Sequence, residues 1–120
     1  METKIRVLIA DPNEDMRLIL SETLGREEDL TVVGAAADGP ETLSLVTELE
    51  PDVVLLELVL PKLDGLSVLR KLPDTGRNPA VLVMTGFVNS HVHKLAYHRI
   101  VSVYVNDTVF FVSSCIFVSI

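Results

Sequence analysis

Two carboxylate side chains each follow a short apolar run in this sequence. Asp11 comes directly after the segment Lys4 to Ala10, and Glu57 ends the unbroken apolar run Val53 to Leu56. An apolar run without alternation is typical of a parallel strand that is buried on both faces. In open α/β sheets, ligands bind outside the carboxyl ends of such strands. Asp11 and Glu57 are therefore candidates for an acidic ligand-binding pocket.

Strand-like runs alternate with helical spacing along most of the chain, and these elements would position the two carboxylates. We expect strands at Lys4 to Ala10, Leu30 to Ala36, Val53 to Leu56, Ala80 to Met84 and Val101 to Val105. Apolar residues recur at helical spacing between them, at Met16 to Leu24, Leu43 to Leu49, Leu66 to Leu72 and Val92 to Ile100, the last with Asn89 or Ser90 as its cap. Such alternation predicts an α/β fold with a doubly wound parallel sheet. The flavodoxin-like order 2-1-3-4-5 is favoured, and it brings Asp11 and Glu57 together at the switch point.

The residues after Glu57 carry a motif that resembles a known family. The loop Leu60-Pro61-Lys62-Leu63-Asp64-Gly65 is similar to the Met-Pro-x-x-Asp-Gly loop of response-regulator receiver domains, the CheY-like superfamily. In that family the preceding strand ends in the aspartate that takes a phosphoryl group from a histidine kinase. The resemblance covers about Lys4 to Ala96, and it is greatest to the receiver of the sporulation-initiation regulator.

The resemblance implies a phosphorylation site that binds Mg²⁺, and this chain departs from it at the acidic pocket. The family's pair of adjacent acids becomes Asp11-Pro12, so one carboxylate is lost. The phosphoacceptor position holds Glu57 instead of aspartate, and the carbonyl that completes the metal site would be that of Val59. The resemblance therefore implies a Mg²⁺ site with Asp11, Glu57 and Val59 as its protein ligands, and a weak one.

Three further family positions lie later in the chain. Thr85 keeps the hydroxyl that ends the fourth strand. An ungapped alignment puts Tyr104 at the aromatic switch position and Asp107 at the position of the family's lysine. Asp107 would reverse a charge beside the pocket and raise the proton affinity of its carboxylates.

These departures predict a phosphorylation-incompetent pseudo-receiver. Glutamate carries its carboxylate one methylene further than aspartate, about 1.5 Å of bond length. A misplacement near 1 Å can slow a reaction by on the order of 100-fold. Glu57 would instead act as a permanent, partial mimic, because a phosphoryl group brings up to about two negative charges. We expect no enzymatic activity, and an effect through contacts with a histidine kinase, a phosphotransferase or a regulator.

The C-terminal segment does not follow the family pattern. We divide the chain into a receiver-like part, 1–107, and an atypical hydrophobic segment of the same domain, 108–120. Thr108 to Ile120 is rich in β-branched and aromatic residues, which favours strand over the expected fifth helix. An extra strand after the Asn106-Asp107 turn would lie at the sheet edge. We therefore expect a homodimer or a higher assembly through residues 101–120. A divergent terminus and a truncated receiver are both open as its origin.

Composition restricts the partners and the compartment. The chain has 120 residues and a net charge of −7, and phosphate binding needs a basic surface, so nucleic acid is not an expected direct partner. The tail is shorter than the roughly 20 apolar residues that cross a membrane. The single cysteine, Cys115, excludes an internal disulfide. Met1 to Lys4 begins no secretory signal, so we expect a cytoplasmic protein.

Other interpretations of the same residues stay open. Asp11 could serve as a helix cap, Glu57 as a plain strand-end acid and Thr85 as a structural residue. His91, His93 and His98 lack the i, i+4 spacing of a helical metal site, which favours a solvated helix face. For the whole chain, the alternatives are an active receiver that accepts a phosphoryl group and a truncated, self-associating remnant.

Overall fold

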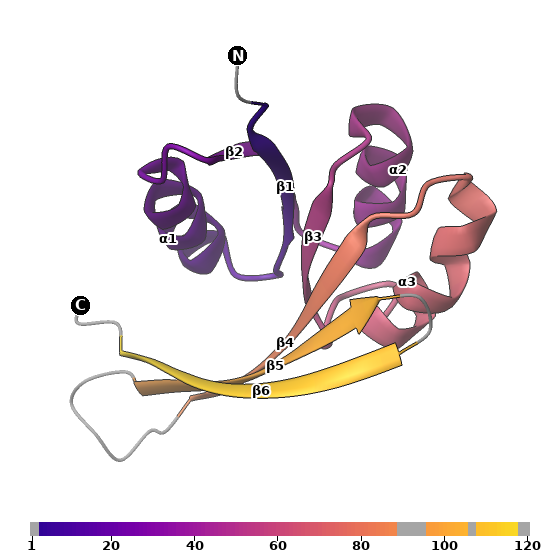
Figure 1. The fold of residues 1–120 in the computed structure, drawn as a ribbon. Coiled ribbons are helices and arrows are strands. Elements are labelled where there is room, and N and C mark those ends of the chain that lie inside the picture. The colour runs from indigo at the N-terminus through magenta and orange to yellow at the C-terminus, as the bar shows by residue number, and fades with distance from the viewer. Residues whose placement is uncertain (1–2, 89–95, 106–107, 118–120) are drawn as a thin grey trace.

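The computed structural model describes residues 3–88, 96–105 and 108–117 of the chain. Six strands and three α-helices follow one another along it, with a short 3₁₀ helix before the fourth strand (Figure 1). The strands are β1 Ile5–Ala10, β2 Leu30–Ala36, β3 Val53–Glu57, β4 Ala80–Val88, β5 Ala96–Val105 and β6 Thr108–Phe117. The helices are α1 Glu14–Gly25, α2 Gly39–Leu49, α3 Gly65–Lys71 and the 3₁₀ helix η1 Leu72–Thr75.

The first four strands form a parallel sheet in the order β2-β1-β3-β4. Helix α1 lies on one face of this sheet, and α2 and α3 lie on the other (Figure 1). The predicted α/β, flavodoxin-like arrangement is therefore confirmed for these strands. Sequence order and sheet order differ at β1, where the chain leaves β2 and returns as β3 on the opposite side of β1.

The predicted fourth helix and parallel fifth strand are wrong where the structure describes them. Ala96 to Ile100, expected to be helical, belong to β5, which runs through Val105 and pairs antiparallel with β4. The rest of that expected helix lies in residues 89–95, outside the described residues. A parallel crossover needs roughly a dozen residues or more, and the connection between β4 and β5 is shorter than that. β-Branched and aromatic residues also favour strand at Tyr97 to Val105.

The C-terminal segment is a strand instead of a fifth helix. β6 pairs antiparallel with β5 from Thr108 to Phe117, with Val105 opposite Thr108 at the start of the ladder. This is the extra strand that the composition of the tail predicts. Asn106 and Asp107, where the turn was expected, lie outside the described residues.

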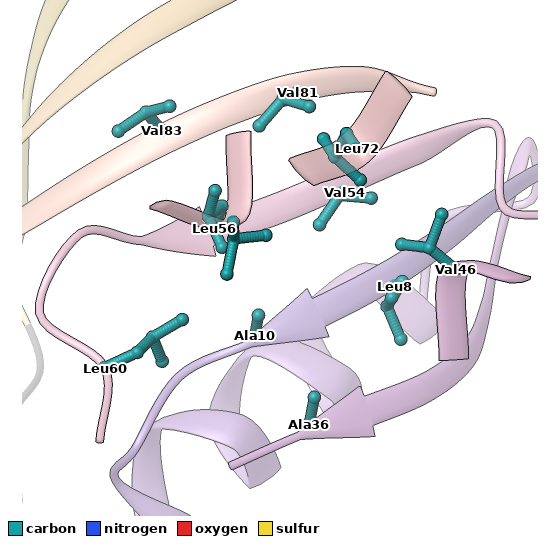
Figure 2. Close-up of a cluster of buried hydrophobic side chains, with 11 residues drawn as sticks. Leu8, Ala10, Ala36, Val46, Val54, Leu56, Leu60, Leu72, Val81 and Val83 are labelled. Carbon is teal, nitrogen blue, oxygen red and sulfur yellow. The ribbon is translucent and has the colours of Figure 1, made fainter. Parts of the chain in front are cut away.

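Two hydrophobic clusters hold the helices to the sheet. The larger one lies on the α2 and α3 face, where Leu8, Val54, Leu56, Val81 and Val83 from alternate strand positions meet side chains of the helices (Figure 2). The smaller one lies on the α1 face and contains Val7, Ile9, Leu55 and Met84. Side chains alternate between the two faces of a strand, so β3 contributes apolar residues to both clusters. This explains why its sequence shows an unbroken apolar run.

Within the residues that the structure describes, no helix is long and apolar enough to cross a membrane.

Candidate functional site

Asp11 and Glu57 lie next to each other at the carboxyl ends of neighbouring strands. In the parallel ladder between β1 and β3, Ala10 pairs with Leu56, so the next residue on each strand is Asp11 and Glu57. Both are almost completely buried, with 2% of Asp11 and 7% of Glu57 exposed. The sheet therefore brings the two carboxylate-bearing residues together at its switch point.

Three hydrogen bonds hold Asp11 in place, two through its backbone and one through its side chain. Its amide donates to the carbonyl of Ala36 at the end of β2, at 3.0 Å. Its Oδ1 accepts the amide of Asn13 at 2.9 Å, and its carbonyl accepts a guanidinium N–H of Arg17 at 2.8 Å. Asp11 is not the cap of α1, because Asn13 fills that position and accepts the amide of Met16. The carboxylate of Asp11 is thus placed for the pocket while a neighbour begins the helix.

Glu57 is held where β3, β4 and α3 meet. It pairs with Met84 of β4, and the amide of the next residue, Leu58, donates to the Met84 carbonyl at 3.0 Å. The amide of Gly65 donates to the Leu58 carbonyl at 2.8 Å, and a Cβ at Gly65 would lie 2.8 Å from the carbonyl of Glu57. Only glycine therefore lets α3 begin so close to the end of β3.

The loop between β3 and α3 is anchored to the start of α2. The carbonyl of Pro61 accepts the amide of Leu63 at 2.7 Å and the amide of Gly39 at 3.3 Å. The first of these bonds closes a three-residue turn around Lys62, whose φ is +67°. A turn with a positive φ at its central residue is rare and strained. The ammonium of Lys62 also lies 3.3 Å from Oδ2 of Asp38, the N-cap of α2.

Sequence reasoning missed this anchor. The sequence places Lys62 in the loop motif and singles out neither Asp38 nor Gly39 as a site residue. A lysine with positive φ has no sequence signature of its own, so the contact could not be inferred before the fold was known.

Hydrogen bonds from helix amides keep two carboxylates of this region ionised. The backbone N–H of Glu41 lowers the pKa of Asp38, against a raising effect of desolvation, and Lys62 lowers it further. The backbone N–H and the hydroxyl of Ser67 lower the pKa of Asp64, the N-cap of α3. Both groups stabilise helix starts that border the pocket.

The structure describes some of the other predicted site residues and not the rest. Val59 follows Glu57 in the loop, and its side chain is 75% exposed. Thr85 follows the Met84 partner of Glu57 on β4. Tyr104 on β5 pairs with Val81, toward the other end of β4 from Met84, because β5 is antiparallel, so the structure does not place this predicted switch residue beside Glu57. His98 is in β5 and so does not belong to a helix face. Asp107, His91 and His93 lie outside the described residues.

Within the described part of the chain, no group of three or more His, Cys, Asp or Glu side chains is placed to hold a metal ion. The acidic pocket offers two carboxylates, and Pro12 beside Asp11 supplies no oxygen from its side chain.

Residues 7–106 match the family described as the response regulator receiver domain. The chain is 47% identical over 81 residues to protein-glutamate methylesterase/protein-glutamine glutaminase 5 of Myxococcus xanthus, which covers 68% of this chain and 23% of that protein. It is 36% identical over 85 residues to protein-glutamate methylesterase/protein-glutamine glutaminase 1 of Methanospirillum hungatei, covering 71% of this chain and 25% of the relative. The chain thus spans about a quarter of the length of these relatives.

Solved structures show the same likeness. The response regulator domain of Thermotoga maritima CheB superposes with a TM-score of 0.67 at 28% identity, over 76% of this chain and 67% of that one. The receiver domain of the response regulator NarL from Mycobacterium tuberculosis gives a TM-score of 0.65 at 30% identity, over 68% and 66% of the two chains. The finer resemblance to the sporulation-initiation regulator stays a prediction.

Proposed function

This chain belongs to the response regulator receiver domain family, and we propose that it is a receiver of a two-component system that signals through protein contacts without being phosphorylated. The observation that carries the proposal is the buried Glu57 at the phosphoacceptor position, on the strand next to Asp11. The relatives' methylesterase activity is not proposed for these residues, because the chain spans only about a quarter of those proteins.

The surroundings of Glu57 support the loss of phosphoryl transfer. In-line transfer needs the attacking oxygen within a fraction of an ångström of its ideal place, and glutamate is longer than aspartate by one methylene. The backbone cannot retreat to compensate, because Leu58 is hydrogen-bonded to Met84 and Gly65 packs against the Glu57 carbonyl. The longer side chain must therefore place its carboxylate away from where an aspartate would attack.

The donor set fits Mg²⁺ weakly. Mg²⁺ usually binds through one or two carboxylates with several waters, in near-ideal octahedral geometry. Asp11, Glu57 and the carbonyl of Val59 would hold it, and the ion would neutralise charge on phosphoryl oxygens. Pro12 removes one acidic ligand, and Oδ1 of Asp11 already accepts the amide of Asn13. We expect any site to bind more weakly than one with a complete pair of acids.

A permanent negative charge at position 57 would replace the phosphorylation signal. The partner would be a histidine kinase, a phosphotransferase or a regulator, in the cytoplasm. Two exposed apolar residues follow Glu57 along the chain, Val59 in the loop at 75% and Leu66 in the first turn of α3 at 52% exposed. We expect these two residues to take part in the contact with the partner. Self-association through residues 101–120 stays a separate prediction.

The test is phosphorylation with acetyl phosphate and Mg²⁺, followed by intact mass measurement. We expect no phosphoryl adduct on the wild-type chain. A phosphorylatable receiver domain treated in parallel controls the reagent. An adduct that appears on the wild type and disappears in Glu57→Gln would instead establish the alternative function, an active receiver that accepts the phosphoryl group on Glu57. An adduct that persists in Glu57→Gln would place it on another residue and would also contradict the proposal.

A further inference from the structure

The described sheet ends in two edge strands, and β2 has one irregularity, where its register against β1 shifts between Val7 and Leu8. β2 and β6 are the outermost strands of the order β2-β1-β3-β4-β5-β6, and they lie at opposite sides of the sheet (Figure 1). Neither sequence, Leu30 to Ala36 or Thr108 to Phe117, contains a charged residue or a proline. Natural sheets usually protect their edges with such residues, because free N–H and C=O groups on an edge can pair with another strand.

A groove follows the β2 edge. It has a volume of about 530 Å³ and is lined by β2 residues 30–35, with Lys4, Ser21 and Gly25 around them. Helix α1 ends at Gly25, and no atom lies within 4 Å of a Cβ added there. Ala35, near the end of β2, is exposed. The groove thus offers a surface of mixed polar and apolar character beside a backbone edge without charge or proline.

We propose that the β6 strand of one copy of this chain pairs with the β2 edge of a second copy and lies along this groove. The strand β6 has ten residues and β2 has seven, so one β6 can cover the whole β2 edge. Both segments are uncharged, which removes the repulsion and the desolvation cost that a charge at a strand edge would bring. This inference does not depend on the proposed function, because it uses neither Asp11 nor Glu57.

The contact joins two different surfaces, β6 of one copy and β2 of the next, so the two copies are not related by a two-fold axis. β2 and β6 of one chain are separated by four strands and cannot meet within that chain. A contact between unlike surfaces is heterologous, and it produces rings or open filaments instead of a two-fold dimer. β6 runs in the same direction as β4, and β4 is parallel to β3, β1 and β2. Copies that repeat one orientation therefore pair β6 with β2 in parallel, as a continuous sheet.

Two charge substitutions separate this arrangement from a symmetric dimer. Ala35→Lys blocks the β2 edge and leaves β6 free, while Ser113→Lys blocks β6 and leaves β2 free. Asn78→Lys, on an exposed residue before β4, adds the same charge away from both edges. Molar mass is measured by size-exclusion chromatography with light scattering over a range of concentrations. Circular dichroism checks the fold of each variant. If Ala35→Lys does not fold, Val33→Lys replaces it, and if Ser113→Lys does not fold, Ser114→Lys replaces it.

We expect the wild type and Asn78→Lys to grow in mass with concentration beyond two copies. Each edge variant alone should be monomeric, and an equimolar mixture of the two should form a 1:1 dimer. A dimer of Ala35→Lys alone would show that β6 pairs with β6, and a dimer of Ser113→Lys alone would show that β2 pairs with β2. Either result overturns the proposal, as does a monomeric wild type or a mixture that stays monomeric. The acetyl phosphate experiment is unaffected by these outcomes, so the two proposals fail separately.

Discussion

The ammonium of Lys62 lies 3.3 Å from Oδ2 of Asp38 and joins the loop after β3 to the first turn of α2. The same loop is held by the hydrogen bond from the amide of Gly39 to the carbonyl of Pro61. Val59, whose carbonyl belongs to the implied metal site, precedes these contacts in the loop. The start of α2 therefore helps to fix the backbone that leaves Glu57.

Two substitutions at Lys62 separate the ion pair from the backbone strain. The Lys62 side chain is 70% exposed, and exposed ion pairs contribute only about 0–1 kcal/mol. A positive φ costs a residue with a Cβ about 1–2 kcal/mol, and glycine adopts it freely. We expect Lys62→Ala to lower the free energy of unfolding by up to about 1 kcal/mol. Lys62→Gly should be more stable than Lys62→Ala in urea unfolding. Equal stability of the two variants would show that the turn is not strained.

The two helix caps with lowered pKa values predict loss of stability in acid. The pKa of Asp38 and of Asp64 is lower in the folded chain than the ordinary value of 3.8. Their contribution to stability is therefore complete above that value and is lost as the pH falls through the folded pKa. Asparagine caps helices about as well as aspartate but does not titrate. The double variant Asp38→Asn, Asp64→Asn should lose less stability than the wild type between pH 5 and 2 in urea unfolding. Parallel pH profiles would contradict the assignment.

The sequence predicts β1, β3 and β4 because burial on both faces leaves a clear signal. The run Val53 to Leu56 is continuous since β3 serves both hydrophobic clusters. It also predicts the meeting of Asp11 and Glu57, because strand ends and sheet order decide which residues are neighbours. The roles of these residues in metal or phosphoryl binding stay predictions.

The error after β4 has a physical origin in the pattern itself. Tyr97 and Ile100 are aromatic and β-branched, so the segment that was expected to be helical also contains residues that favour a strand. Pairing with β4 decides in favour of the strand. The anchor formed by Lys62 and Asp38 was also beyond prediction, since it depends on a backbone conformation that no local residue type dictates.

Glycine substitutions should distinguish close packing from open surface. An added Cβ at Gly39 would overlap the backbone of Leu63 and lie 2.5 Å from its Cβ, whereas at Gly25 it would meet nothing within 4 Å. Overpacking costs typically about 1–3 kcal/mol, so Gly39→Ala should destabilise by at least that amount. Gly25→Ala, in the last residue of α1, should be neutral or stabilise by up to about 1 kcal/mol. Thermal and urea unfolding of the two variants measure the difference. A stable Gly39→Ala would mean that the loop moves away from α2 without cost.

Metal binding should be weak and should depend on Asp11. With two carboxylates and a carbonyl as donors, we expect titration calorimetry to give a lower Mg²⁺ affinity than for Pro12→Asp, which restores the second acid. Asp11→Ala should abolish the remaining signal, while Asp29→Ala, at a surface acid before β2, should not change it. Tight binding by the wild type would contradict the weak donor set. Binding that survives Asp11→Ala would place the ion outside the acidic pocket.

Restoring the acceptor alone should not restore phosphorylation. In Glu57→Asp the carboxylate is one methylene shorter, but Pro12 still withholds an acidic ligand. Each misplaced or missing group commonly slows a reaction by on the order of 100-fold, so we expect the single variant to form little adduct with acetyl phosphate. The double variant Pro12→Asp, Glu57→Asp supplies the acid and the acceptor together. Its rate of adduct formation in intact mass spectra should exceed that of the single variant by at least about 100-fold. Equal rates would mean that the glutamate alone prevents transfer. If the double variant binds Mg²⁺ and still forms no adduct, the limiting defect must lie in the altered strands after β4.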